Sequence, residues 1–158
     1  MRRLSPVTAT VAAGALALAA VTGCSAASAG SSSIAPTGAY VQQPTATGKA
    51  TVGYLDIRNN GAADKLLSVT TSAGGTVALR GPVRPDASPV LMHTVRDIPI
   101  PANSMTQLVP NSYHLLITGA GPMRDGKDIT LRLRFAHAGT VTVLALVTNP
   151  GGTSGGYF

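Results

Sequence analysis

The sequence predicts an antiparallel β-sandwich, and three features support this fold class. Seven or eight short apolar segments between residues 51 and 147 alternate as half-buried strands do. Pairs of Gly, Pro and Asn separate these segments at regular intervals and mark turns. No segment after the first 23 residues has the period of an amphipathic helix. Many short strands joined by such turns are typical of two packed antiparallel sheets.

The turn residues delimit the strands in order. Asn59-Asn60-Gly61 ends the first strand, and Gly81-Pro82 ends the third. Pro99 and Pro101 confine the end of the fourth strand to a sheet edge or a turn, because proline cannot donate to the ladder. The seventh strand alternates most clearly, with Ile, Leu or Phe at every second position and Thr or Arg between them. The predicted strands cover residues 51–58, 65–71, 76–80, 90–100, 105–109, 113–118, 129–135 and 140–147.

The N-terminus predicts export. A basic start, Met1-Arg2-Arg3, precedes an apolar stretch of about 15 residues, which is short of the ~20 that a membrane-spanning helix needs. The stretch ends in Val21-Thr22-Gly23-Cys24, which resembles a bacterial lipobox. The resemblance implies that residues 1–23 are a lipoprotein signal peptide. It also implies that Cys24 is acylated and anchors the protein to the outer face of the cell membrane. The alternative is an ordinary secreted protein whose cysteine lies near the cleavage site by coincidence.

One folded domain is predicted between two segments of simple composition. Residues 24–49 are rich in Ser, Ala, Gly, Thr and Pro, and they carry too few large apolar side chains to offset chain entropy. We expect this segment to be a flexible tether. Residues 50–149 form the predicted β-sandwich domain. Residues 150–158 are rich in glycine and are expected to be a disordered tail.

The composition argues against several classes of function. Cys24 is the only cysteine, so the lipidated chain keeps no thiol for a disulfide, a cysteine zinc site or cysteine catalysis. The twelve Lys and Arg residues are scattered and form no stripe that would track phosphates, so nucleic acid is not an expected partner. No Gly-x-Ser-x-Gly elbow is present, and most Asp residues stand in turn-like contexts. The chain is therefore not expected to be an enzyme.

Met92, His93 and His114 are the side chains best suited to bind a metal. Thioether sulfur is soft and selects Cu(I), and imidazole binds either oxidation state of copper. Met92 and His93 lie in a predicted strand, and His114 follows a proline turn. A methionine on a strand is more often a core residue. A single histidine is more often a hydrogen-bonded structural residue. These three residues alone leave both interpretations open.

A longer pattern extends in order from about residue 50 to residue 148. Its segments are Tyr54–Asn59, Ala63–Val69, Gly75–Leu79, Ile98–Ala102, Leu108–Leu115 and Ile129–Phe135. Together these segments resemble the PCuAC domain of periplasmic copper chaperones. This resemblance implies a cupredoxin-like β-sandwich with Greek-key connections that binds copper as Cu(I). It also implies a copper-accepting partner, such as an oxidase or another copper chaperone.

The family holds copper through two histidines and two methionines, and this chain keeps two of the four. The resemblance places His114 at the second histidine and Met92 at the first methionine. Arg80 stands at the first histidine and Leu116 at the second methionine, so these positions are degenerate. The permanent charge of Arg80 would repel a cation. His93 can compensate only where its strand bends, because adjacent strand residues point to opposite faces.

Two functional hypotheses follow. The first is an extracytoplasmic lipoprotein of the copper-chaperone type, which delivers or buffers Cu(I) for a membrane or exported client. The second is a metal-free binding module on the same fold, which has lost the copper site because Arg80 and Leu116 replace two ligands.

Overall fold

The structure, a computed structural model, describes residues 31–84 and 90–151. Its described residues form ten β-strands, and no helix long and apolar enough to cross a membrane occurs among them. The predicted signal peptide, the lipid site at Cys24 and residues 152–158 of the predicted tail lie outside this part. The strands are β1 (Ile34–Gln42), β2 (Thr51–Asn59), β3 (Asp64–Thr71), β4 (Thr76–Pro82), β5 (Met92–Thr94), β6 (Ile98–Ile100), β7 (Ser104–Leu108), β8 (His114–Thr118), β9 (Asp128–Phe135) and β10 (Thr140–Thr148).

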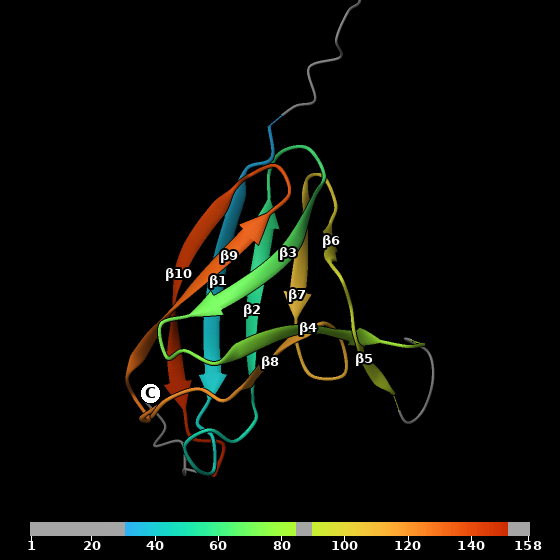
Figure 1. Cartoon of the computed structure of the whole chain (residues 1–158). Helices are drawn as coiled ribbons and strands as arrows, with labels where there is room; N and C mark the ends of the chain where they lie inside the picture. Colours follow the sequence, from blue (N-terminus) through green and yellow to red (C-terminus); the bar gives the residue numbers. More distant parts are fainter. Residues whose placement is uncertain (1–30, 85–89, 152–158) are drawn as a thin grey trace, which may run out of the picture.

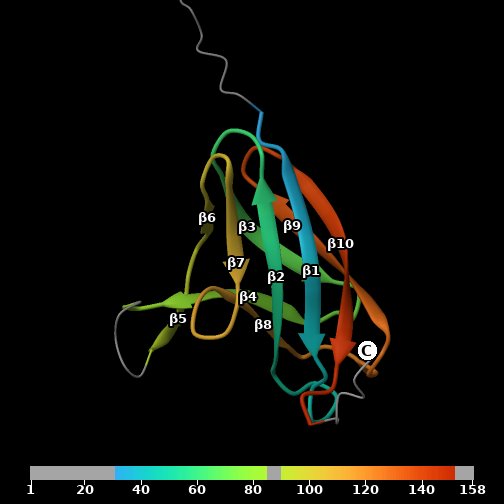
Figure 2. The same ribbon diagram turned by 180° about the vertical axis from the view of Figure 1, so that it is seen from behind.

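The ten strands join into one hydrogen-bonded sheet that curls into two layers. The strand order is β5-β4-β8-β2-β1-β10-β9-β3-β6, and β7 also pairs with β2. Figures 1 and 2 view opposite sides and show β3 and β9 in one layer and β1, β2 and β7 in the other. The predicted all-β, sandwich-like fold is confirmed. The sheet is mixed rather than purely antiparallel, because β1 and β10 run parallel.

Alternating side chains from both layers fill a core made of aliphatic residues. Each buried leucine, isoleucine or valine contributes about 1.5–3 kcal/mol relative to an exposed one. The chain has no Trp and only two Phe residues, so this aliphatic packing supplies most of the apolar burial. The largest side chains that are fully buried are those of Val41, Leu55, Ile57, Leu66, Ile98, Ile100, Leu108, Leu115, Ile117, Leu131, Leu133 and Val147.

Strand β1 corrects the expected flexible tether over residues 24–49. Ile34–Gln42 lies between β2 and β10 and hydrogen-bonds to both. Its register shifts between Thr37 and Tyr40, where Gly38 has a φ of 60°, a conformation that favours glycine. Only Val41 is fully buried in this strand. Backbone hydrogen bonds on both sides stabilise β1. Because this stabilisation does not depend on an alternating apolar pattern, the sequence pattern did not predict the strand.

The predicted long strand over residues 90–100 is also wrong, because the segment forms two short strands. β5 pairs with β4 at one end of the strand order, and β6 pairs with β3 at the other end. The chain therefore crosses between the two edges of the curled sheet within this segment. Pro99 lies on the edge strand β6, opposite Lys65, where a missing N–H is tolerated.

The carboxylate of Asp64 joins three segments at one end of the sheet. Ser32 Oγ donates to it over 2.6 Å, and the backbone amides of Lys65, His137 and Ala138 donate over 2.7, 2.9 and 2.8 Å. Burial alone would raise the pKa of Asp64, but these hydrogen bonds outweigh it and hold the pKa well below its usual range. Asp64 therefore fixes the start of β1 and the β9–β10 turn to β3.

We expect Asp64→Asn to destabilise the fold by about 2–3 kcal/mol at pH 7. The side-chain NH₂ group of Asn would face the Ser32 hydroxyl and backbone amides that donate to the carboxylate in the wild type. Because the pKa of Asp64 is lower in the folded state, its carboxylate stabilises the wild type fully above the pKa of the unfolded state, about 4. This stabilisation is lost as the pH falls towards the pKa of the folded state. Urea unfolding of both chains should therefore show a stability difference that shrinks below about pH 4. Asp128→Asn, on an exposed residue, is the matched control. Equal stability of the two variants at pH 7 would contradict this role.

Candidate metal site

A row of side chains crosses the outer face of the sheet and contains His114. The register pairs Tyr40 with Tyr54, Arg80 with His114, and Arg80 with Thr94. Opposed residues of neighbouring strands place their side chains on the same face. The Tyr54 ring joins the two parts of the row, with its centroid 5.2 Å from that of Tyr40 and 6.2 Å from that of His114. The row therefore runs across β1, β2, β8, β4 and β5.

The His114 ring is held by its backbone neighbourhood. Its Nδ1 lies 3.1 Å from the carbonyl oxygen of Ser112, which selects the tautomer with the proton on Nδ1. The Nε2 atom then keeps its lone pair, as a metal-ligating histidine requires. The neighbouring Tyr54 is buried, and this burial, with a smaller effect of Tyr40, raises the pKa of Tyr54. Tyr54 therefore stays neutral beside the imidazole at physiological pH.

Met92 shares the face of His114, on the other side of β4. It pairs with Pro82, two residues after Arg80, so its side chain points to the same face as that of Arg80. Met92 is half-buried and stands at the start of β5, an edge strand. The backbones of β5 and β8 are about 10 Å apart, because neighbouring strands lie about 4.8 Å apart. Met92 and His114 therefore have to reach over β4 to share one ion.

Arg80 lies between these two donors and fastens β5 to β4. Its Nη1 donates to Thr94 Oγ1 over 2.9 Å, and its Nη2 donates to the carbonyl oxygen of Met92 over 2.8 Å. The guanidinium group thus directs its donors to the strand that carries Met92. The same group places a permanent positive charge next to His114, which opposes binding of a cation.

Leu116 completes the set of four family positions on one face. It pairs with Ala78 and stands two residues after His114, so both side chains share a face. Leu116 contributes apolar surface to a hollow of about 330 Å³ that Gln42, Val52 and other residues also line. It offers packing but no metal donor.

The structure does not bring His93 to this face. His93 pairs with Gly81, one residue out of phase with Met92, and the β4–β5 register is regular. The bend that could bring both side chains to one ion is therefore absent. His93 is exposed on β5. No cluster of three or more His, Cys, Asp or Glu side chains that could hold a metal occurs within residues 31–84 and 90–151.

Sequence reasoning missed Tyr40, Tyr54, Thr94 and Ser112, which support the site without belonging to its ligand pattern. Tyr54 is one of four tyrosines in a chain with few aromatics, and that scarcity was the one available signal. Its contact with His114 depends on the pairing of β2 with β8, which a linear pattern does not reveal.

We expect Arg80→Ala to loosen β5 and leave the core intact. The variant loses both hydrogen bonds to this short edge strand, whereas the buried side chains are unchanged. Amide hydrogen exchange at His93 and Val95 should accelerate by about fivefold or more, which corresponds to about 1 kcal/mol. Arg134→Ala, on an exposed arginine of β9, should leave these amides unchanged. Unchanged exchange in the Arg80 variant would show that the guanidinium group does not hold β5.

Comparison with known structures supports the fold that the sequence predicts. The apo PCuAC domain from PmoF1 is 21% identical with a TM-score of 0.64, over 74% of this chain and 94% of that domain. The copper-bound PCuAC domain from PmoF2 is 19% identical with a TM-score of 0.60, over 74% of this chain and 93% of that domain. Apo-DR1885 from Deinococcus radiodurans is 22% identical with a TM-score of 0.56, over 94% of this chain and 97% of that one.

A family model gives the sequence-level relationship. No curated protein sequence matches the chain. The family described as "Putative lipoprotein LpqE-like" matches residues 34–147, which include β1 and almost all of β10. The protein therefore belongs to the LpqE-like family and has the fold of PCuAC domains.

Proposed function

We propose that this protein is an extracytoplasmic copper carrier that holds Cu(I) through His114 and Met92. The observation that carries the proposal is the common face of all four ligand positions, on which the Ser112 carbonyl engages Nδ1 of His114 and not Nε2. Structures of the same fold support it, since the PCuAC domain from PmoF2 is described as copper-bound and DR1885 as its Cu(I) form.

The donor set fits Cu(I) as a cargo. An imidazole nitrogen and a thioether sulfur suit this soft ion, and the lipidated chain has no thiol to compete with them. Arg80 and Leu116 supply no ligand, and the charge of Arg80 weakens the site. A two-donor site leaves coordination positions open to the ligands of a client. We therefore expect weak retention of the ion and easy transfer to a copper-accepting partner, such as an oxidase or a second chaperone.

A competition titration with a Cu(I) chelator tests the site on the purified chain. His114→Ala should bind Cu(I) at least about tenfold more weakly than the wild type, since the loss of an outer-shell partner alone costs about that much. Met92→Leu, which keeps the volume of the side chain, should also weaken binding. His93→Ala is the matched control and should leave the affinity unchanged, because His93 lies on the opposite face.

Restoring the two missing ligands should change the Cu(I) affinity in the opposite direction. Arg80→His with Leu116→Met should strengthen Cu(I) binding well beyond that of the wild type, because it refills both degenerate positions. If the wild type binds no more tightly than His114→Ala, the site does not bind copper.

That last result would favour a metal-free binding module on the same fold. The specific observation behind this alternative is the guanidinium group of Arg80, which directs its donors to Thr94 and the Met92 carbonyl within the family's ligand region. The face would then bind a partner through its side-chain row rather than through an ion.

We also propose that an acylated Cys24 anchors the chain to the outer face of the cell membrane. The lipobox-like ending at Cys24 and the lipoprotein description of the family support this location. Strand β1 shortens the expected tether, because only ten positions separate Cys24 from Ile34. Ten residues span at most about 35 Å, so the domain would stay close to the membrane.

Metabolic labelling with a radioactive fatty acid tests the anchor. The wild-type chain should carry the label and remain with the membrane fraction. Cys24→Ala should lose the label and keep the folded domain, because the first described strand begins ten positions later, at Ile34. Labelling of the Cys24→Ala chain, or a wild type without label, would contradict the proposal.

A further inference from the structure

A second region of the outer face, over β3, β9 and β10, carries two arginines between rows of hydroxyl groups. Arg132 on β9 pairs with Thr70 on β3 and with Thr142 on β10. Arg134 stands two residues further along β9, on the same face, and its partners on β3 and β10 are Ser68 and Thr140. Both arginines are exposed. In the described part of the chain, neither guanidinium group makes a hydrogen bond or an ion pair.

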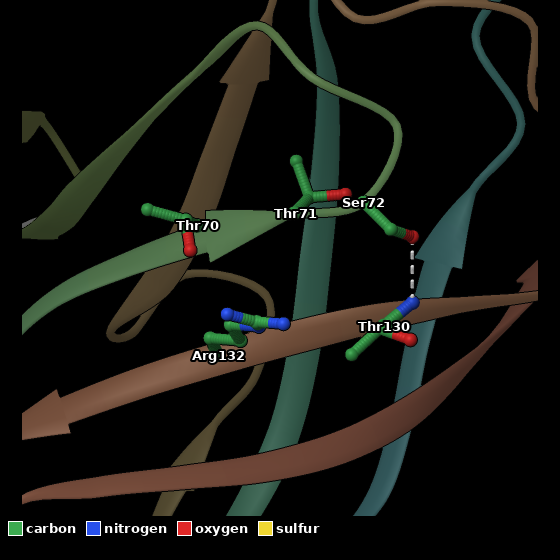
Figure 3. Close-up of a pocket in the computed structure, with 5 residues that line it drawn as sticks. All are labelled: Thr70, Thr71, Ser72, Thr130 and Arg132. Carbon is green, nitrogen blue, oxygen red and sulfur yellow. Dashed lines mark hydrogen bonds between the residues drawn. The ribbon is translucent and has the colours of Figure 1, made fainter.

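A hollow of about 320 Å³ opens on this face, lined by Thr70, Thr71, Ser72, Thr130 and Arg132. Figure 3 shows Arg132 on β9 with the side chains of Thr70 and Thr130 on either side of it. The backbone amide of Thr130 donates to Ser72 Oγ over 2.9 Å, so the hydroxyl proton of Ser72 stays available to a ligand. A guanidinium fork beside free hydroxyl donors is the chemistry that binds a phosphate group.

Exposed leucines border the hollow on the same face. Leu144 on β10 pairs with Thr130 and is 62% exposed. Leu146 follows at 45% exposure, and it pairs with Asp128 on one side and Tyr40 on the other. The apolar side chains thus continue directly from the cationic hollow. A soluble phosphate would gain nothing from this neighbourhood, whereas a lipid presents phosphate and apolar surface together.

We propose that this face of β3, β9 and β10 binds the headgroup of an anionic phospholipid. The phosphate contacts Arg132 and Arg134 and accepts hydrogen bonds from the hydroxyls of the hollow. Leu144 and Leu146 enter the boundary between headgroups and acyl chains, where Tyr40 also suits an amphipathic environment. Asp128 lies opposite Leu146, at the end of β9 away from Arg134, and repels the phosphate, which keeps the headgroup at the arginine end. This function is independent of copper.

Titration of the lipid-anchored chain, held in neutral detergent micelles, tests the proposal. Short-chain phosphatidylglycerol, short-chain phosphatidylcholine and inorganic phosphate are the probes, and amide shifts of Thr70, Ser72 and Thr130 are the readout. Phosphatidylglycerol should bind most tightly. A basic residue near an anionic surface is worth about 1 kcal/mol, so Arg132→Gln with Arg134→Gln should lower that affinity by about 25-fold.

Matched variants separate the parts of the site. Arg124→Gln removes an exposed loop arginine and should leave the affinity unchanged. Leu144→Ser with Leu146→Ser should weaken lipid binding but not the binding of inorganic phosphate. Asp128→Asn should strengthen lipid binding.

Three results would overturn the proposal. Equal affinity for phosphatidylcholine would show that charge plays no part. Inorganic phosphate that binds as tightly as phosphatidylglycerol would make this a site for free phosphate. An equal loss in Arg124→Gln would reduce the effect to net charge. Each substituted residue is exposed, so the amide spectrum outside this face should stay that of the wild type.

Discussion

The position of β1 in the middle of the sheet is the constraint on which the rest of the structure depends. On one side of β1 lie β2, β8, β4 and β5, and on the other lie β10, β9, β3 and β6. Along this order, β1 is the only hydrogen-bonded link between the two groups of described strands. Its ends are fixed, since Ser32 donates to Asp64 and the amide of Gln43 donates to the Thr148 carbonyl over 2.7 Å. Loss of this strand would divide the hydrogen-bonded sheet into two sheets that only side-chain packing and the connecting loops hold together.

The same strand supports the candidate metal site from the side, through Tyr54. Tyr40 on β1 packs on Tyr54, and Tyr54 packs on the His114 ring. The imidazole is therefore held from two directions, by an aromatic neighbour and by the Ser112 carbonyl. Met92 has no comparable support, because β5 is a short edge strand that Arg80 fastens to β4. The replacement of a histidine by Arg80 thus removes a ligand but adds hydrogen bonds that order the strand of the remaining methionine.

The strands that could be predicted from the sequence are those whose residues carry their own alternating pattern. Residues 129–135 and 140–147 needed no tertiary information, and the structure confirms both strands to within one residue. Strand β1 could not be predicted, because its Ala, Pro, Thr and Gly residues are held by backbone bonds to strands distant in sequence. The division of residues 90–100 depends on which sheet edges the segment joins, and local periodicity contains no such information.

The candidate site shows the same division between local pattern and tertiary pairing. Met92 and His114 were candidates by residue type, whereas the positions of Arg80 and Leu116 could be identified only through the family resemblance. The common face of the four required the β4–β5 and β4–β8 registers. The opposite orientation of His93 followed from strand geometry alone, since adjacent residues on a regular strand diverge. The hydrogen bonds by which Arg80 holds β5 could not be predicted from the local sequence, because their acceptors lie 12 and 14 residues away.

The proposed lipid face and the proposed copper site are linked by one row of side chains. Leu146 pairs with Tyr40, and the row continues through Tyr54 to His114. Three strand spacings of about 4.8 Å separate β10 from β8, so the two sites lie about 14 Å apart along the curved sheet. A domain that stood upright on its anchor would hold His114 far from the bilayer, near the distal end of β1. Contact of Leu144 and Leu146 with the membrane would instead lay β1 along the surface. That orientation brings the metal position to the depth at which a membrane client could receive its ion.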